Sequence, residues 1–156
     1  MEHNYDSRAL TKIVRNKNLY KNKVNNTANG KYSLNETAFE IVRYLTKKET
    51  LPLSDLVEYL NVNKALVTRL TQDLESQGYL TILPDSSDKR KKILKVTPLA
   101  YEAKDKEWAL EHTFYEQCLS VLTPTEYDTF MRLLDKVYKE SKRLRKTSFQ
   151  DLVHEE

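Results

Sequence analysis

The residues in this sequence with the clearest potential for chemistry are four consecutive cations beside an acid, namely Asp88, Lys89, Arg90, Lys91 and Lys92. Lysine and arginine side chains neutralise phosphates, and along a nucleic acid this releases condensed counterions. An arginine at a hairpin tip can also enter a minor groove, whose negative potential deepens as the groove narrows. The alternative is a solvated surface turn, the usual interpretation of a charge run. The segments on either side decide between the two.

Those segments have the composition of β-strands. Residues 79–84 (YLTILP) and 93–97 (ILKVT) are rich in aliphatic and β-branched side chains, and their apolar positions alternate. The polar loop 85–92 would then form the tip of a hairpin. The sequence therefore predicts a basic β-hairpin, or wing.

A helix over residues 63–78 is predicted immediately before the wing. Asn63 suits the N-cap, and Gly78 suits the left-handed position that follows a helix. One face is apolar at helical spacing, through Leu66, Val67, Leu70 and Leu74. At about 14 residues, or about 21 Å, the helix could lie in a major groove. With a short helix and a tight turn at 61–63 before it, this is a helix-turn-helix pattern.

The opposite face of that helix carries side chains suited to base and phosphate recognition. Arg69 could bond a guanine, and Ala65 or Thr68 could contact a thymine methyl group. The helix N-terminus favours a phosphate. The alternative for Arg69 is an ion pair with Asp73 or Asp88. The predicted DNA-binding residues are Asn63, Lys64, Ala65, Thr68, Arg69, Gln72, Asp88, Lys89, Arg90 and Lys91.

Before the helix-turn-helix, the pattern predicts an N-terminal helix from about residue 5 to 24 and a turn at 25–32. The first helix has a narrow apolar stripe, Leu10, Ile13 and Val14, which a partner subunit could cover. Its cations, Arg15, Lys17, Lys21 and Lys23, are expected on a solvated face. Ser33 and Glu36 resemble a capping box that opens a second helix. Residues 51–53 could form a short strand, and Ser54 is expected to cap the third helix.

Two helices are predicted after the wing. Thr97 and Pro98 form a start signal for a helix that reaches about Leu122. Thr123, Pro124 and Glu126 combine a capping box with a proline at the first helical position. The last helix carries an apolar stripe made of Tyr127, Phe130, Leu133, Leu134, Val137, Tyr138 and Leu144. The acidic tail after Lys146 is expected to fray.

Composition excludes several classes of protein. The 156 residues are 39% hydrophobic and 31% charged, with a net charge of +3, and only two glycines and four prolines argue against an all-β fold. No apolar run approaches the roughly 18 residues of a membrane span, and no signal peptide is apparent. The single cysteine, Cys118, fits a reducing cytoplasm. It is expected to be buried and structural, and the alternative is a redox-active cysteine. The scattered histidines predict no metal site, and the absence of nucleotide-binding and hydrolase motifs predicts neither a cofactor nor an enzyme.

The segment LVTRLTQDLESQGYLTILPDSSDKRKKILKVTPLA resembles the recognition helix and wing of the MarR family of transcriptional regulators. The matching motifs are Val67-Thr68-Arg69, Leu74-Glu75-x-x-Gly78-Tyr79-Leu80, Asp88-x-Arg90 and Val96-Thr97. Ala100 departs from the glycine found in many members, with little expected consequence for a helix.

The resemblance implies a homodimer whose N- and C-terminal helices interlock. It implies that Arg90 enters the minor groove and that Asp88 orients it. Many members are repressors released by a small, often aromatic, effector bound between the dimer and DNA-binding lobes. Phe39, Arg43 and Tyr44 lie near the crevice expected there, although core or surface packing is the commoner role for such residues.

The sequence thus predicts a mainly α fold with a small β wing, a winged helix-turn-helix flanked by N- and C-terminal dimerisation helices. Residues 1–32 would form the N-terminal dimerisation helix and linker, 33–97 the DNA-binding domain, and 98–156 the C-terminal dimerisation helices and a short tail. The predicted function is a sequence-specific transcriptional regulator, expected to be a repressor, that binds a pseudo-palindromic operator in double-stranded DNA as a homodimer. The alternative is a winged-helix protein-interaction module without DNA binding. Four adjacent cations in the wing argue against that alternative.

Overall fold

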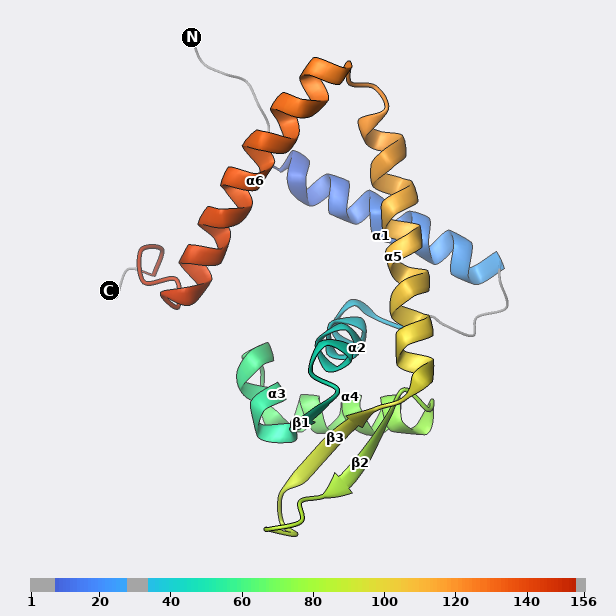
Figure 1. Cartoon of the computed structure of the whole chain (residues 1–156), viewed down its shortest axis with the longest axis vertical. Helices are drawn as coiled ribbons and strands as arrows, with labels where there is room; N and C mark the ends of the chain where they lie inside the picture. Colours follow the sequence, from blue (N-terminus) through green and yellow to red (C-terminus); the bar gives the residue numbers. More distant parts are fainter. Residues whose placement is uncertain (1–7, 28–33, 154–156) are drawn as a thin grey trace. The chain divides into compact units, whose positions relative to one another are not determined.

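The computed structural model describes residues 8–27 and 34–153. The chain divides into two compact units, Met1–His112 and Thr113–Glu156. Along the described residues the elements are α1 (Ala9–Thr27), α2 (Glu36–Lys48), β1 (Thr50–Pro52), α3 (Leu53–Leu60), α4 (Lys64–Ser76), β2 (Leu80–Pro84), β3 (Lys92–Val96), α5 (Pro98–Leu119) and α6 (Pro124–Lys146) (Figure 1). The mainly helical fold with a small β wing is confirmed.

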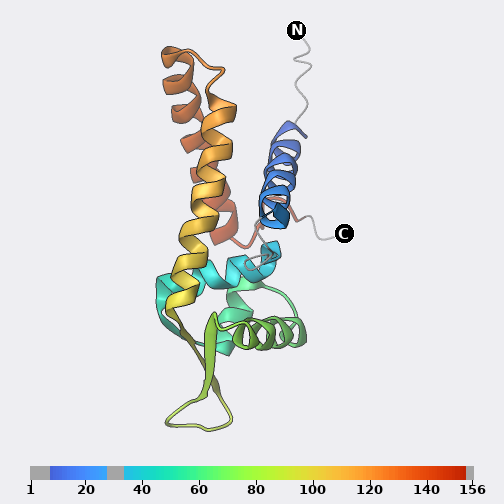
Figure 2. The ribbon, with the colours of Figure 1, turned by 90° about the vertical axis from the view of Figure 1, so that its right-hand side faces the viewer.

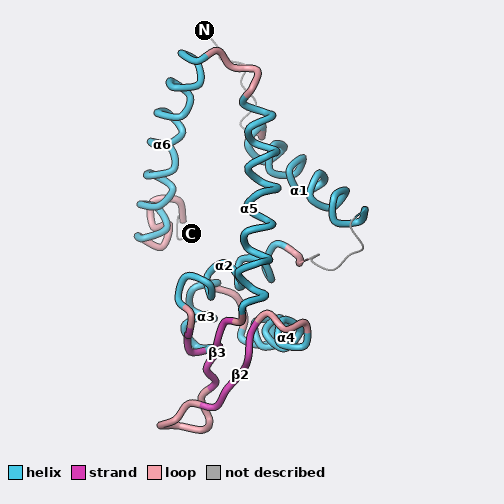
Figure 3. Tube along the Cα trace, turned by 45° about the vertical axis from the view of Figure 1, so that its right-hand side comes forward, coloured by secondary structure: helices cyan, strands magenta, loops and turns pink. Residues whose placement is uncertain are grey.

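The three strands form one antiparallel sheet in the order β1-β3-β2. Leu94 at the centre of β3 pairs with Leu51 of β1 and with Ile82 of β2. The hairpin of β2 and β3 is the predicted wing (Figure 3). Its loop covers 85–91 and not 85–92, because Lys92 already pairs with Pro84. The short strand predicted at 51–53 is present one residue earlier.

The core of the first unit lies between the sheet and helices α2, α3 and α4. Ile41, Leu56, Val67 and Leu94 are completely buried there. Val67 belongs to the predicted apolar face of α4, whose Leu70 and Leu74 are also buried while Leu66 is half-buried. Ala100, near the start of α5, is fully buried as well, and its small side chain lets the helix approach the core closely. This packing fixes which face of α4 remains outside.

Both ends of α4 are capped as the sequence predicts. The Asn63 side chain accepts a hydrogen bond from the Leu66 backbone N at 2.8 Å. At the other end, Gly78 N donates to the carbonyl of Glu75 at 2.9 Å and Tyr79 N to that of Leu74 at 3.0 Å. This pair of bonds is a Schellman motif, which requires a left-handed residue, and Gly78 has φ +85°. The motif ends the helix and turns the chain into the wing.

Replacing Gly78 by alanine should therefore lower stability by about 1–2 kcal/mol, since an L-residue is strained at this φ. The added Cβ would lie 3.6 Å from Leu99 Cδ2, an ordinary contact, so backbone strain supplies the effect. Urea unfolding of both proteins measures the loss. Equal midpoints would contradict the strained assignment.

The starts of α2 and α3 and the end of α5 differ from prediction. α2 is capped by Asn35, whose side chain accepts from Ala38 N at 2.8 Å, and the predicted cap Ser33 lies outside the described residues. α3 begins at Leu53, which is drawn into the core, so Ser54 is inside the helix and not its cap. α5 begins at Pro98, as predicted, with Thr97 immediately before it. The Thr97 hydroxyl donates to the Gly78 carbonyl at 2.6 Å, closing the base of the wing. α5 ends at Leu119, where Ser120 bonds the Gln117 carbonyl.

In the N-terminal region, α1 continues to Thr27, three residues into the segment predicted as a turn. Asn25, the first of these added residues, is buried. The predicted start near residue 5 and the remainder of the turn, 28–32, lie outside the described residues.

The second unit contains the end of α5 and α6. The capping box at the start of α6 is confirmed, with Thr123 N donating to Glu126 Oε2 at 2.9 Å and Glu126 N to Thr123 Oγ1 at 3.4 Å. Cys118 is exposed, so the expectation of a buried cysteine is wrong. The last buried residue of α5 is Glu107, and Cys118 lies well beyond it. None of the described helices combines the length and apolarity that crossing a membrane requires.

Candidate nucleic-acid interface

The outward face of α4 carries the polar residues that the sequence singles out. Asn63, Lys64, Ala65, Arg69 and Gln72 are exposed, and Thr68 is half-buried. The buried positions of the same helix are Val67, Leu70, Thr71 and Leu74. Within the described residues Arg69 forms no ion pair, so the alternative pairing with Asp73 or Asp88 is not observed. The α4 side chains are thus available to an external partner.

The connection between α3 and α4 is the tight turn of a helix-turn-helix. Asn61 adopts the left-handed conformation with φ 51° and ψ 42°, which asparagine tolerates better than most residues. Its backbone N donates to the Val57 carbonyl at 3.0 Å and closes α3. α4 therefore leaves the turn with its N-terminus and the Asn63 cap exposed.

Asp85 orders the wing loop, a role that the sequence analysis did not assign. Its Oδ1 accepts hydrogen bonds from Ser87 N at 2.7 Å, Ser87 Oγ at 2.6 Å and Asp88 N at 3.1 Å. The bonds from Ser87, followed by that from Asp88, hold the pKa of Asp85 below its usual range. An aspartate that bonds the backbone two residues on is a known turn former, so the Asp-Ser-Ser-Asp sequence held this signal.

Asp88 forms hydrogen bonds with Arg90, the residue that it orients according to the family resemblance. Asp88 Oδ1 accepts from the Arg90 backbone N at 3.1 Å and from its Nε at 3.3 Å. The Arg90 side chain is nevertheless 94% exposed. Its guanidinium is fixed at one edge while the rest faces solvent. Lys89 and Lys91 flank it and are also exposed.

A groove joins α4 to the wing. It has a volume of about 480 Å³ and is lined by Pro52, Leu53, Ser54, Val57, Lys64, Thr68, Arg90, Lys91 and Lys92. Four of the predicted residues (Lys64, Thr68, Arg90 and Lys91) therefore share one hollow. The other six lie outside its lining, at the N-cap of α4, on α4 or in the wing loop: Asn63, Ala65, Arg69, Gln72, Asp88 and Lys89. The loop itself projects beyond α4 (Figure 2). The groove thus has cations on both its helical and its hairpin side.

A second charged cluster lies between α1 and α5, where it corrects a prediction. Lys17 and Lys21 are each only 6% exposed and do not lie on a solvated face, whereas Arg15 and Lys23 are exposed. Lys17 Nζ lies 2.9 Å from Glu111 Oε1, and Lys21 pairs with Glu107. The two lysines are spaced i, i+4 on α1, and the two glutamates are spaced i, i+4 on α5, so each pair lies on one face of its helix. The matched spacing was a signal in the sequence, although it could not show that the two faces meet.

The lysines of this cluster lower the pKa of Glu111. Burial acts to raise its pKa, but the hydrogen bond and charge of Lys17, with those of Lys21, outweigh burial and lower it below 4.5. The folded state therefore holds this proton more weakly than the unfolded state. The stabilisation is present above the ordinary value of 4.5 and is lost as pH falls through the lower, folded-state pKa.

Replacing Glu111 by glutamine should lower stability by about 1–2 kcal/mol at pH 7, the range for hydrogen bonds to charged groups reduced for partial exposure. The difference from the unmodified protein should shrink as pH drops below about 4.5, where the native carboxylate also becomes protonated. Urea unfolding at several pH values measures this, with Glu102→Gln at an exposed site on α5 as the control. A difference that did not change with pH would contradict the assignment.

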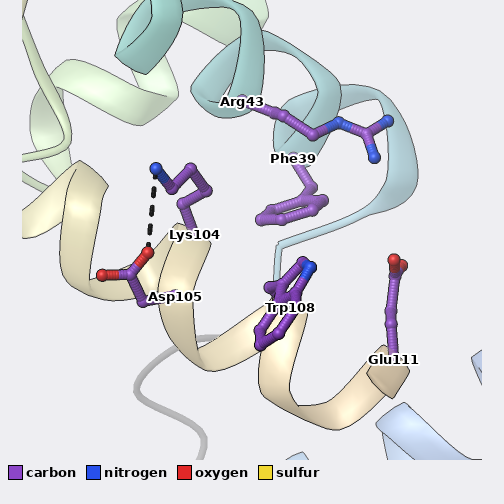
Figure 4. Close-up of a pocket in the computed structure, with 6 residues that line it drawn as sticks. All are labelled: Phe39, Arg43, Lys104, Asp105, Trp108 and Glu111. Carbon is purple, nitrogen blue, oxygen red and sulfur yellow. Dashed lines mark ion pairs between the residues drawn. The ribbon is translucent and has the colours of Figure 1, made fainter.

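A crevice of about 320 Å³ lies between α2 and α5 (Figure 4). Its lining is Phe39, Arg43, Lys104, Asp105, Trp108 and Glu111. Phe39 and Arg43, two of the residues named from the resemblance, are therefore brought together. Tyr44 is not part of the lining, because its ring stacks on Tyr59 of α3 at 3.7 Å. Among the described residues no three His, Cys, Asp or Glu side chains are grouped as a metal site requires.

A helix-turn-helix followed by a two-stranded basic wing defines the class of winged helix-turn-helix proteins. Comparison with known proteins makes this more specific. The MarR family model matches residues 34–92. Transcriptional regulator AdcR of Streptococcus pneumoniae serotype 2 (strain D39 / NCTC 7466) is 34% identical over 106 residues, which are 66% of this chain and 73% of that protein.

Solved structures agree on the fold. A MarR crystal structure matches with a TM-score of 0.73 at 18% identity, over 94% of this chain and 98% of that one. A mutant MarR from E. coli, complexed with operator DNA, matches with a TM-score of 0.61 at 21% identity, over 83% and 91% of the two chains. This chain belongs to the MarR family.

Proposed function

We propose that this chain is a transcriptional regulator that binds a pseudo-palindromic operator in double-stranded DNA. The observation that supports it most strongly is the groove in which Lys64 and Thr68 of α4 meet Arg90 and Lys91 of the wing. The E. coli MarR mutant, which has the same fold, was crystallised with operator DNA. A protein-interaction module would have no use for cations on both sides of such a groove.

α4 and the wing would bind in different grooves of the duplex. α4 enters a major groove, where Arg69 and Gln72 can bond base edges and Ala65 can contact a methyl group. Asn63 and Lys64 lie at the helix N-terminus, which favours a backbone phosphate. Arg90, oriented by Asp88, reaches the adjacent minor groove, while Lys89 and Lys91 neutralise phosphates.

The regulator acts as a homodimer. α6 has no buried residue, and its apolar stripe is exposed: Tyr127 42%, Phe130 41%, Leu133 48%, Leu134 38%, Val137 58% and Tyr138 59%. On α1, Leu10, Ile13 and Val14 are also more than 40% exposed. An exposed apolar stripe of this kind on a helix marks a protein interface. We therefore keep the proposed dimerisation segments 1–32 and 98–156, with half-sites about one helical turn (~34 Å) apart.

Repression, with release by a small aromatic effector, completes the proposal. The crevice between α2 and α5 supports an effector site, because two aromatic side chains and two cations are among the residues that line it.

Binding to the DNA upstream of the protein's own gene tests the function. Tight binding that survives unrelated competitor DNA is expected, with log K falling linearly as log salt rises. Footprinting should then show two half-sites. Binding that disappears on addition of competitor would leave only a basic surface and would favour the interaction module.

A further inference from the structure

Helix α6 carries a surplus of positive charge. Its 23 residues include seven cations and four acids. The difference of three equals the net charge of the entire chain at pH 7. No residue of α6 is buried. The helix therefore has as much excess charge as the whole protein, and this charge lies at the surface.

Five of these cations form one row along the helix. They follow one another at alternating steps of four and three residues: Arg132, Lys136, Lys139, Arg143 and Lys146. Residues at such steps lie on one face of an α-helix, and all five side chains are exposed. We call this row the α6 ridge. At 1.5 Å per residue it is about 21 Å long.

The α6 ridge lies on the side of the helix opposite the apolar stripe. With 3.6 residues per turn, the centre of the ridge is about 170° around the helix axis from the centre of the stripe. A second copy of the chain that covers the stripe would therefore leave the ridge in contact with solvent. The ridge is thus a separate surface from the proposed dimer interface.

Ion pairs within the second unit compensate only part of the ridge. Lys139 Nζ lies 2.6 Å from Asp135 Oδ2, and Arg143 bonds Glu140 and Asp151. Within the part of the chain that the structure describes, no ion pair is formed by the other three cations, Arg132, Lys136 and Lys146. The helix dipole favours cations only in the last turn, so it accounts for neither Arg132 nor Lys136.

A row of cations on a face without apolar side chains suits a nucleic acid better than a protein or a membrane. A protein interface has a core rich in aromatic and apolar side chains, and a helix that lies on a membrane buries its apolar face in the lipid. Because the apolar stripe points away from the ridge, neither partner could contact both. Duplex DNA carries one charge per about 1.7 Å of its axis, so the ridge spans about 12 phosphate charges.

We propose that the α6 ridge binds the backbone of a second DNA duplex while α4 and the wing hold the operator. The proposal rests on the proposed function and adds an activity to it, the bridging of two DNA segments. Lysine and arginine bond phosphates whatever the base sequence, so the second duplex needs no operator. Each copy in the dimer provides one ridge.

Capture of a second duplex by operator-bound protein tests the bridging. Immobilised operator is saturated with the full chain, excess protein is washed away, and a labelled duplex without operator sequence is added. We expect capture at about 50 mM salt. Arg132→Gln combined with Lys136→Gln should reduce the slope of log K against log salt by about 2, since each lost phosphate contact removes about 0.9. Between about 50 and 200 mM salt, the affinity of the unmodified protein should thus fall about tenfold more.

Two control variants separate charge from other effects. Arg132→Lys combined with Lys136→Arg keeps both charges at the same positions and should capture the second duplex as the unmodified protein does. Lys47→Gln combined with Lys95→Gln removes the same charge from exposed sites outside α6 and should also retain capture. Analytical ultracentrifugation should show that every variant is dimeric, because the ridge lies opposite the stripe.

Equal capture by the unmodified protein and the double glutamine variant would overturn the proposal, and so would loss of capture in the charge-exchanged variant. If capture were absent but a long operator fragment bound more tightly than one trimmed to the footprint, the ridge would contact the flanks of the same duplex, and the bridging would be wrong. Binding of phosphatidylserine vesicles in place of the second duplex would contradict the assignment to DNA.

The proposed function and the ridge can fail separately. Failure of the unmodified protein to bind any operator would remove the proposed function and, with it, the bridging. The salt dependence of binding to the unrelated duplex alone would then still test the ridge. There, a slope that the double glutamine variant left unchanged would show that the ridge does not contact phosphates.

Discussion

Replacing Arg90 by alanine is expected to weaken operator binding about tenfold or more while leaving the fold unchanged. The side chain is 94% exposed and bonds only the loop residue Asp88 in this structure, so the core loses nothing. An arginine that contacts base edges or a narrow minor groove contributes about 1–3 kcal/mol. Fluorescence anisotropy at physiological salt measures the affinity, and a thermal melt checks the fold.

Lys95→Ala is the matched control, because Lys95 is an exposed cation on β3 that does not line the groove. Its removal lowers the net charge by the same amount and should cost much less affinity. If Arg90→Ala bound the operator as tightly as the unmodified protein, the wing would have no role in recognition.

Introducing arginine at Leu134 is expected to weaken the dimer more than about a hundredfold. Leu134 and Leu133 lie on the exposed apolar stripe of α6. In the proposed dimer a partner covers this stripe, and an unpaired charge there would cost about 3 kcal/mol or more. Since the operator has two half-sites, DNA affinity should fall as well. Analytical ultracentrifugation over a range of concentrations measures the assembly directly.

Asp128→Arg places the same side chain on the opposite, exposed face of α6 and should leave the dimer intact. The variant Leu133→Arg provides a second position on the stripe. Fully dimeric Leu133→Arg and Leu134→Arg proteins would show that the stripe is not the interface.

The elements that carry the candidate site could be predicted because their signals are local. Asn63 and Gly78 bound a helix with one apolar face, and alternating strands enclose the basic loop, so a short window of sequence contains all the information. The capping box at Thr123 is similarly local. The ends of elements were less predictable. Asn35, two residues after the predicted cap Ser33, caps α2. Leu53 is buried and is the first residue of α3, so the helix begins before the predicted cap Ser54.

The sequence could not predict the contacts between side chains of different helices and strands, because these depend on which faces pack together. Lys17 and Lys21 look like solvated cations until α5 brings Glu107 and Glu111 against them. Glu40 gives no sign in the sequence that it bonds both Arg43 and Tyr59. The shared groove of Lys64 and Arg90 likewise exists only once the wing folds beside α4. The DNA contacts of all ten predicted residues remain predictions.

We expect the ion pairs between α1 and α5 to form late in folding. Lys17 and Glu111 are 94 positions apart in sequence, whereas the wing strands pair across a short hairpin. Closing a long loop costs more chain entropy than closing a short one, so distant contacts form later. During synthesis α1 leaves the ribosome first, yet its partners on α5 emerge only after the entire winged domain. Until then α1 has only its contacts with α2, where Lys17 Nζ lies 3.6 Å from Glu36 Oε1 and Lys21 Nζ lies 5.2 Å from the centre of the Phe39 ring. We therefore expect the contacts of α1 with α5 to form after those with α2.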